Sequence, residues 1–353
     1  MPSEFHRRLP CNWDSRPGEK PEWWWNMLDC RFDVAGTPQP LFLAIRNDSL
    51  NAYAEGQSIF KISFGKDGEP SAKIHHKYVC KGAEGVKYLT LRGDKINGKT
   101  YEGSAMLDKW VANARCYREG EKKGIAQILA KNGCVIDVEM GLPASRVGDH
   151  TDEHGAPRMD IVALEKDGDT LKIVFYEMKL FSNSSLRARS HIPEVLAQLK
   201  RYETWINNDD RKEQIVSAYR NACKILIKLN GIRYRKAGKD VHRFIEQAAA
   251  KTAMEIDPKP RLIIFEFDYD PKRQCGAWTG QEEDLRQGGI CGIRLIMQPR
   301  PEDITLPETT EEAYAAASRD HASQIGLELK HRRIESSDLS DPGDQEGANF
   351  TRS

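Results

Sequence analysis

Short runs of apolar residues alternating with polar ones dominate the chain between residues 41 and 79. Four such runs are rich in β-branched, aromatic and aliphatic side chains, which favour strands. Turn-forming sequences separate them at Asn47-Asp48, Glu55-Gly56 and residues 65–68. This spacing is typical of an antiparallel meander, in which neighbouring strands pair through short turns. The pattern therefore predicts a small β-rich N-terminal domain over residues 23–103.

Three consecutive tryptophans, Trp23 to Trp25, mark the predicted start of this domain. Such a run can stack on nucleic-acid bases, but aromatic clusters at the start of a domain more often pack in a core, and we expect core packing here. Residues 1–22 are rich in Pro, Arg and Glu. They predict an N-terminal arm that at most docks on the surface.

After Gly103 the apolar residues recur at helical intervals. Residues 106–133 predict two helices, or one helix kinked at Gly120, with Asn132-Gly133 as the stop. Strands are then expected over residues 134–142, 158–169, 171–180, 261–270 and 291–299, and helices over 191–206, 210–231 and 239–254. A hairpin turn at 167–169 joins the second and third strands, and Asn230-Gly231 is expected to stop the second of these helices. The order predicts an α/β domain over residues 104–300, with a mixed sheet flanked by helices. Residues 301–353 predict one helix and then a disordered C-terminal tail.

Composition limits the class of protein. The 353 residues are 39% hydrophobic and 30% charged, as in a folded, water-soluble protein. Because 53 Lys and Arg balance 53 Asp and Glu, a polyanionic partner has to be met by a local basic patch. The eight cysteines stand singly, which argues against a cysteine zinc site. No signal-like or membrane-spanning apolar run is visible, so no membrane association and a cytoplasmic location are expected.

Three charged side chains fall on two strands that are predicted to pair. Asp160 lies early in strand 158–169, and Glu177 and Lys179 lie in the strand after the hairpin turn. Because side chains alternate along a strand, Glu177 and Lys179 share one face, and Asp160 can lie opposite them. Two carboxylates this close repel each other, and a hard divalent cation such as Mg²⁺ would relieve the repulsion. Such a cation activates a phosphate and a water, while Lys179 orients that water or offsets developing charge.

The sequences Pro157-Arg158-Met159-Asp160 and Glu177-Met178-Lys179 resemble the motif of the PD-(D/E)XK nuclease superfamily. The superfamily core of helix, three-stranded meander, helix and strand is similar to the element order from Tyr117 to Asp268, with extra helices inserted over residues 209–254. The resemblance covers less than half of the chain and leaves the β-rich domain without a counterpart.

The resemblance implies a restriction-endonuclease-like fold and Mg²⁺-dependent cleavage of phosphodiester bonds, with Mn²⁺ able to substitute. Many members carry a Gln and a Tyr one helical turn apart after the metal strands, as Gln198 and Tyr202 are here. The implied catalytic residues are Asp160, Glu177, Lys179, Gln198 and Tyr202. The implied metal ligands are Glu121, Asp160, Glu177 and Met178.

Other interpretations of these residues stay open. Glu177 and Lys179 can also form an ordinary surface ion pair, and Gln198 can be a core residue bonded to the backbone. Asp137 and Glu139 share a face of the first strand, where Glu139 is a candidate additional ligand and a supporting role is favoured. Residues 146–154 are rich in His and Asp like a metal cluster, but their Gly and polar content favours a mobile loop.

Basic and amide side chains follow the proposed catalytic strand. Asn183, Arg187 and Arg189 are expected to bind phosphates of the substrate. Residues 228–239 place Lys and Arg around Tyr234, which predicts either a patch that tracks a nucleic-acid backbone or a solvated loop.

These features predict a DNA-cleaving enzyme of restriction, phage defence or repair. The alternatives are an RNA-cleaving nuclease and a non-catalytic nucleic-acid-binding or complex-assembly module with the same fold. The β-rich domain is expected to select the substrate or to bind a protein partner, and self-association into a homo-oligomer stays open.

Overall fold

A computed structural model gives the arrangement of most of the chain. It describes residues 4–15, 17–79, 87–141, 158–187, 193–233, 241–250, 252–267, 281–290, 293–297, 305–309 and 311–312. The His/Asp-rich segment 146–154, Pro157, Arg189, residues 234–239 of the basic segment and the predicted C-terminal tail lie outside these residues.

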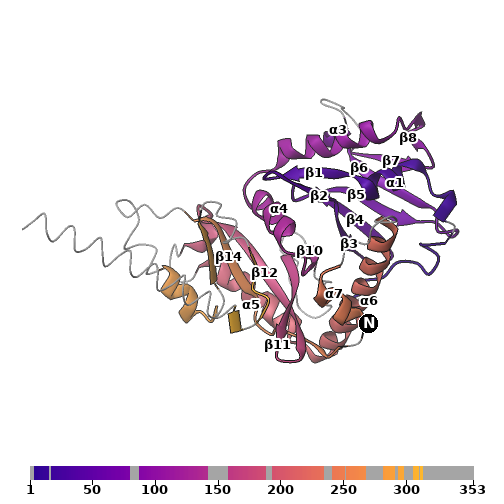
Figure 1. The fold of residues 1–353 in the computed structure, drawn as a ribbon. Helices are drawn as coiled ribbons and strands as arrows, with labels where there is room; N and C mark the ends of the chain where they lie inside the picture. The colour runs from indigo at the N-terminus through magenta and orange to yellow at the C-terminus, as the bar shows by residue number, and fades with distance from the viewer. Residues whose placement is uncertain are drawn as a thin grey trace, which may run out of the picture.

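The N-terminal part forms a seven-stranded antiparallel sheet with its strands in chain order, which confirms the predicted meander (Figure 1). Its strands are β3 (Phe42–Ile45), β4 (Ser49–Ala54), β5 (Gln57–Phe64), β6 (Pro70–His75), β7 (Tyr88–Arg92), β8 (Lys95–Ile96) and β9 (Lys99–Thr100). A separate hairpin of β1 (Arg31–Val34) and β2 (Thr37–Pro40) precedes it. The accompanying helices are η1 (Pro17–Glu19), α1 (Glu22–Asp29), α2 (His76–Val79) and α3 (Ser104–Ala114). Trp23 and Trp24 of α1 are buried, as expected of core residues.

A second, six-stranded mixed sheet follows in the order β10-β11-β12-β14-β15, with β13 also paired to β12. Its strands are β10 (Val135–Gly141), β11 (Arg158–Asp167), β12 (Thr170–Leu180), β13 (Met254–Ile256), β14 (Arg261–Phe267) and β15 (Ile293–Met297). The first three are antiparallel, whereas β13 and β14 run parallel to β12, and β15 runs parallel to β14. The described part of the chain is thus mixed α/β, as predicted.

Helices flank the second sheet. They are η2 (Arg115–Tyr117), α4 (Glu121–Lys131), η3 (Ser184–Leu186), α5 (Glu194–Ile206), α6 (Asp209–Arg233) and α7 (Arg243–Ala249), and residues 281–287 are also helical. In Figure 1, α4 and the edge strand β10 lie on the side of the second sheet that faces the N-terminal part, and both β10 and α6 contact β3 of the N-terminal sheet. Buried apolar side chains from both sheets form one continuous core. No helix in the described part is both long and apolar enough to cross a membrane.

Local sequence explains where these elements break. Gly120 has φ +52°, a left-handed conformation that suits glycine and separates α3 from α4, so the two-helix prediction is confirmed. Gly168 has φ +57° in the turn between β11 and β12. Strand β12 is buried on both faces along most of its length, which is typical of a central strand.

Three expectations are corrected. Residues 4–15 are not a surface arm, because Phe5, Leu9 and Trp13 are buried in the core. Asn230-Gly231 does not stop α6, which continues to Arg233. The helix expected over residues 239–254 is shorter, because α7 ends at Ala249 and Met254 begins β13, a strand of three residues that is too short to show a periodic pattern.

Candidate active site

Strands β11 and β12 bring Asp160 and Glu177 together. Their antiparallel register pairs Ile161 with Tyr176, so Asp160 is one step beyond this pair and comes opposite Glu177. The main-chain N–H of Met178 donates to Asp160 Oδ2 at 2.8 Å, which holds the Asp160 carboxylate against β12. The structure therefore gathers the predicted pair of carboxylates at the point where the hairpin pairing ends.

Glu177 is almost completely buried, with 2% of its surface exposed. Its Oε1 atom accepts from Lys179 Nζ at 2.5 Å and from Gln198 Nε2 at 2.7 Å. Its Oε2 atom is buried and has no hydrogen-bond partner within the described residues. An unpartnered carboxylate oxygen costs free energy in a protein interior. This oxygen is therefore a candidate ligand atom for a cation. The interpretation of Glu177 and Lys179 as a solvated surface pair is wrong, because both side chains are buried.

The protonation equilibria of these groups are shifted. Burial, together with the nearby Asp160 carboxylate, raises the pKa of Glu177 to about 8. Burial also raises the pKa of Asp160 to about 6, against the opposing effect of the Met178 N–H. Burial alone would lower the pKa of Lys179, but the adjacent Glu177 carboxylate reverses this effect and the pKa is raised. Lys179 is therefore a charged ammonium, and a cation at the two carboxylates would favour their ionised forms.

Helix α5 connects the carboxylates to the start of β11. Gln198 donates from Nε2 to the hydroxyl of Tyr202 at 2.6 Å as well as to Glu177. The Tyr202 hydroxyl in turn donates to the main-chain oxygen of Arg158 at 2.5 Å. Gln198 is half-buried and lies beside the carboxylate site, as predicted, and its described hydrogen bonds go to side chains and not to the backbone.

Glu121 begins α4 on the other side of the site. Its Oε1 accepts from Asn183 Nδ2 at 3.0 Å, and its charge contributes to the raised pKa of both Asp160 and Glu177. Gly124 allows α4 to approach the sheet, since a Cβ atom there would lie 2.7 Å from Met178 Sδ. The Met178 side chain thus faces α4, on the side of β12 opposite to Glu177.

A divalent cation fits this site in part. Asp160 and Glu177 supply oxygen atoms, and one of them, Glu177 Oε2, has no other partner in the part of the chain that the structure describes. Among the described residues, no group of three or more His, Cys, Asp and Glu side chains is gathered as a ready metal centre. Glu121 therefore acts through its charge in this arrangement, and a cation would need water or phosphate oxygens to complete its coordination.

The expected phosphate-binding residues are placed only partly at the site. Asn183 is bonded to Glu121 and to the N–H of Ser185. Arg187 follows η3, where it is half-buried, donates to the main-chain oxygen of Asn183 and lies over the ring of Phe181. Both are close to the start of α4, whereas Arg189 lies outside the described residues.

Asp137 and Glu139 face the N-terminal sheet. Asp137 is buried and is bonded by Arg7, Arg46 and Tyr219. Glu139 is bonded by Lys122 and accepts from the hydroxyl of Tyr53. Both carboxylates therefore have protein partners, which favours the supporting role.

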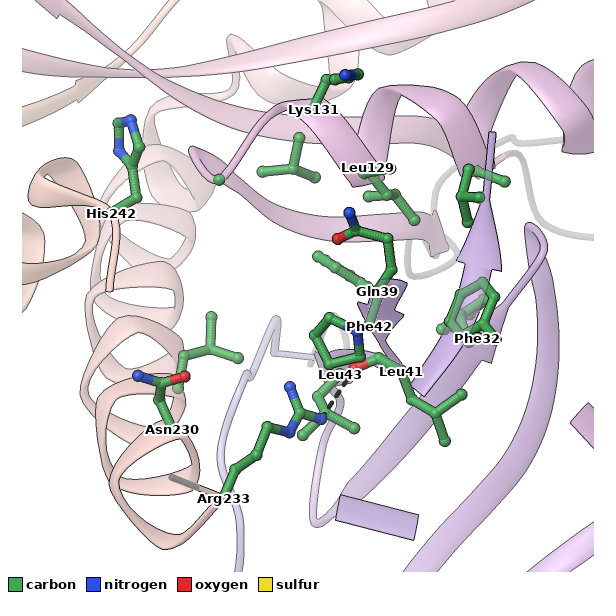
Figure 2. A pocket seen from close by; sticks show the side chains of 18 of the residues that line it. Phe32, Gln39, Leu41, Phe42, Leu43, Leu129, Lys131, Asn230, Arg233 and His242 are labelled. Carbon is green, nitrogen blue, oxygen red and sulfur yellow. Dashed lines mark hydrogen bonds between the residues drawn. The ribbon is translucent and has the colours of Figure 1, made fainter. Parts of the chain in front are cut away.

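The described part of the basic segment 228–239 makes contacts within the protein. Lys228 forms an ion pair with Asp14. Figure 2 shows Arg233 at the edge of a largely apolar cavity of about 320 Å³, where it donates to the main-chain oxygen of Leu41 at 2.9 Å. These two residues connect α6 to the N-terminal part, whereas Tyr234 and the other cations of the segment lie outside the described residues.

No family model, curated protein or solved structure matches this chain. The functional assignment therefore depends on the geometry of the site.

Proposed function

We propose that this chain is a divalent-metal-dependent phosphodiesterase that cleaves DNA, with a restriction-endonuclease-like core. The observation that carries the proposal is the pair of half-buried Asp160 and buried Glu177, in which Glu177 Oε2 has no partner among the described residues and lies beside the ammonium group of Lys179. Burying Glu177 next to a second carboxylate costs free energy, and this arrangement is useful if the two carboxylates hold Mg²⁺ or Mn²⁺ against a phosphate.

Each residue has a separate role in this proposal. Asp160 and Glu177 hold the cation, which supplies Lewis-acid activation of the phosphate and of a water when it is bound. Lys179 orients the attacking water or offsets the charge that develops on the phosphate oxygens. Gln198 fixes the orientation of the Glu177 carboxylate, and Tyr202 fixes Gln198. Gln198 and Tyr202 are therefore positioning residues, and their contribution comes through Glu177.

The test is a titration of Mg²⁺ and Mn²⁺ with purified full-length chain and circular and linear DNA. The expected result is metal-dependent cleavage that is lost in Glu177→Gln. Cleavage of RNA alone would reassign the substrate class. Metal-independent binding of nucleic acid without cleavage of DNA or RNA would instead support the non-catalytic module.

Metal binding has its own readout, independent of cleavage. Mn²⁺ binding, followed by electron paramagnetic resonance of the free ion, is expected for the wild type and is expected to be much weaker in Asp160→Asn. Equal Mn²⁺ binding by the two proteins would show that the carboxylate pair is not the metal site.

A further inference from the structure

A cavity of about 470 Å³ lies between the two sheets, beside the carboxylate site. One wall consists of β4 to β7 and α2 of the N-terminal sheet, and the other includes the start of α4, the end of β10 and the start of β11. Seven lysines and arginines line it, and Glu139 is the one carboxylate among its described lining residues. Its dimensions suit a ligand of the size of one or two nucleotides.

Three of the seven cations form ion pairs with two carboxylates of the protein. Arg7 and Arg46 share the buried carboxylate of Asp137, and Lys122 is bonded to Glu139. The other four cations are Lys61, Lys73, Lys77 and Arg158. No described carboxylate forms an ion pair with any of these four, so the cavity carries a substantial positive charge within the described part of the protein.

Two of these lysines are placed directly against each other. Lys61 on β5 and Lys73 on β6 are register partners, and both are exposed on the face of the sheet that lines the cavity. Like charges directly opposite each other in an antiparallel pair are destabilising. An anion bound between them would turn this repulsion into attraction, which gives the arrangement a physical rationale.

Other groups in the wall are suited to the same kind of ligand. The hydroxyl of Ser58 is shielded from solvent and has no hydrogen-bond partner among the described residues. Burial, together with the charge of Lys122, lowers the pKa of Lys77, and burial together with the surrounding cations lowers the pKa of His75. The ring of Tyr88 lies 5.3 Å from that of His75 and provides an aromatic surface beside the cations. The cavity thus combines phosphate-binding cations with a hydroxyl donor and aromatic rings.

Two residues that line the cavity lie close in the sequence to residues of the proposed active site. Arg158, in the wall, is two residues before Asp160 on the same strand and so projects from the same face of the sheet. Lys122, also in the wall, directly follows Glu121 on α4. A strand bound at the carboxylates can therefore extend into this cavity.

We propose that this cavity, which we call the interdomain phosphate pocket, binds backbone phosphates of the nucleic acid whose cleavage is proposed above. The N-terminal sheet thereby becomes part of the substrate-binding surface, with Lys61 and Lys73 as its central phosphate contacts. The identification of the ligand as nucleic acid rests on the proposed function, since the cations by themselves would also suit a free nucleotide.

The experiment measures binding without cleavage. Full-length protein in chelator is titrated into fluorescently labelled single-stranded and duplex DNA, and fluorescence anisotropy gives the affinity at several salt concentrations. In the double variant Lys61→Gln/Lys73→Gln, affinity is expected to fall by about tenfold or more, and the slope of log affinity against log salt is expected to decrease by about 1.5. The melting temperature is expected to stay constant or rise, because the variant removes a repulsive pair.

The matched control is Lys95→Gln/Lys99→Gln, which removes the same charge from exposed positions of β8 and β9 in the same sheet. This control is expected to retain wild-type affinity. Equal effects of the two double variants, or no effect of either, would overturn the pocket. Tight binding of a nucleoside triphosphate with the same dependence on Lys61 and Lys73, without binding of DNA, would overturn the nucleic-acid assignment.

The two proposals can fail separately. Lysine-dependent binding of DNA without metal-dependent cleavage would uphold the pocket and reject the phosphodiesterase. Cleavage that is unaffected by Lys61→Gln/Lys73→Gln, in DNA concentrations well below saturation, would uphold the phosphodiesterase and reject the pocket.

Discussion

The carboxylate of Asp160 accepts the main-chain N–H of Met178, the residue between Glu177 and Lys179, at 2.8 Å. The register pairs of β11 and β12 end at Ile161 and Tyr176, and this hydrogen bond joins the two strands beyond that pair. Asp160 consequently has two tasks, because it holds β12 near its C-terminal end and supplies one of the two neighbouring carboxylates. Substitutions at this residue can separate the structural task from the chemical one.

Asp160→Asn is expected to abolish metal-dependent cleavage and to keep the fold, because the amide oxygen still accepts from Met178. Asp160→Ala is expected to abolish cleavage as well, but it leaves the Met178 N–H without an acceptor at a cost of about 1 to 3 kcal/mol, reduced by the relief of repulsion with Glu177. Cleavage assays and urea unfolding of both variants measure the two effects. Wild-type cleavage by either variant would remove Asp160 from the site.

The raised pKa values of the carboxyls predict the pH dependence of stability. The native metal-free protein retains protons at Glu177 up to about pH 8 and at Asp160 up to about pH 6, whereas the unfolded chain loses them near the ordinary carboxyl values. Their contribution to stability is therefore present at low pH and is lost as the pH rises through the folded-state values.

Glu177→Gln removes the carboxyl group with the more strongly raised pKa, and with it the largest part of this pH dependence of stability. The free energy of unfolding of the variant, relative to the wild type in chelator, is expected to increase by at least about 1 kcal/mol between about pH 5 and about pH 9. Mg²⁺ is expected to stabilise the wild type at the higher pH and to have little effect on the variant. A constant difference across this range would show that Glu177 has an ordinary pKa.

Lys179→Met is expected to slow the chemical step much more than it weakens DNA binding, because the ammonium group is proposed to act on the water or the transition state. Single-turnover cleavage and anisotropy binding measure the two effects separately. If affinity alone falls and the single-turnover rate is unchanged, Lys179 is a phosphate anchor.

Gln198→Ala is expected to slow cleavage by about tenfold or more, or about 1.4 kcal/mol in barrier, because Glu177 loses the donor that orients it. Tyr202→Phe retains the buried ring and removes the hydroxyl that bonds Gln198 and the Arg158 carbonyl, so it is expected to cost about 1 kcal/mol of stability and to slow cleavage less than Gln198→Ala. Melting curves and specific activities separate the two effects. Early melting with full specific activity in both variants would confine Gln198 and Tyr202 to a structural role.

Two adjacent arginines test the packing of the N-terminal segment. Arg7 is bonded to the buried carboxylate of Asp137, whereas Arg8 is exposed and pairs with exposed Asp48. Arg7→Leu is expected to cost about 3 kcal/mol, because it removes a partner from a buried charge. Arg8→Leu, the matched control, is expected to cost less than about 1 kcal/mol in the same urea unfolding measurement. Similar effects of the two variants would show that residues 4–15 are not docked as described.

The sequence by itself determined the elements and the local part of the site. Strand alternation and helical periodicity are local patterns, and they predicted the meander of β3 to β6, the α3–α4 break at Gly120 and the β11–β12 hairpin. Because Asp160, Glu177 and Lys179 lie on the two strands of one hairpin, their proximity followed from register alone. Gln198 required one further step, the packing of α5 on the face of β12 that carries Glu177.

Only the tertiary structure decided the contacts between segments that are distant in the chain. Arg7 and Asp137 are 130 positions apart, and no local pattern indicates that the N-terminal segment neutralises a buried carboxylate of β10. The basic cavity likewise combines Lys61 and Lys73 with Arg158 across two sheets. Alternation alone places Lys61 and Lys73 on one face of β5 and β6, but whether that face meets water or another part of the protein depends on how the sheets pack. Periodicity specifies which side of a strand is polar, whereas the balance of long-range packing, desolvation and charge pairing specifies what that side faces.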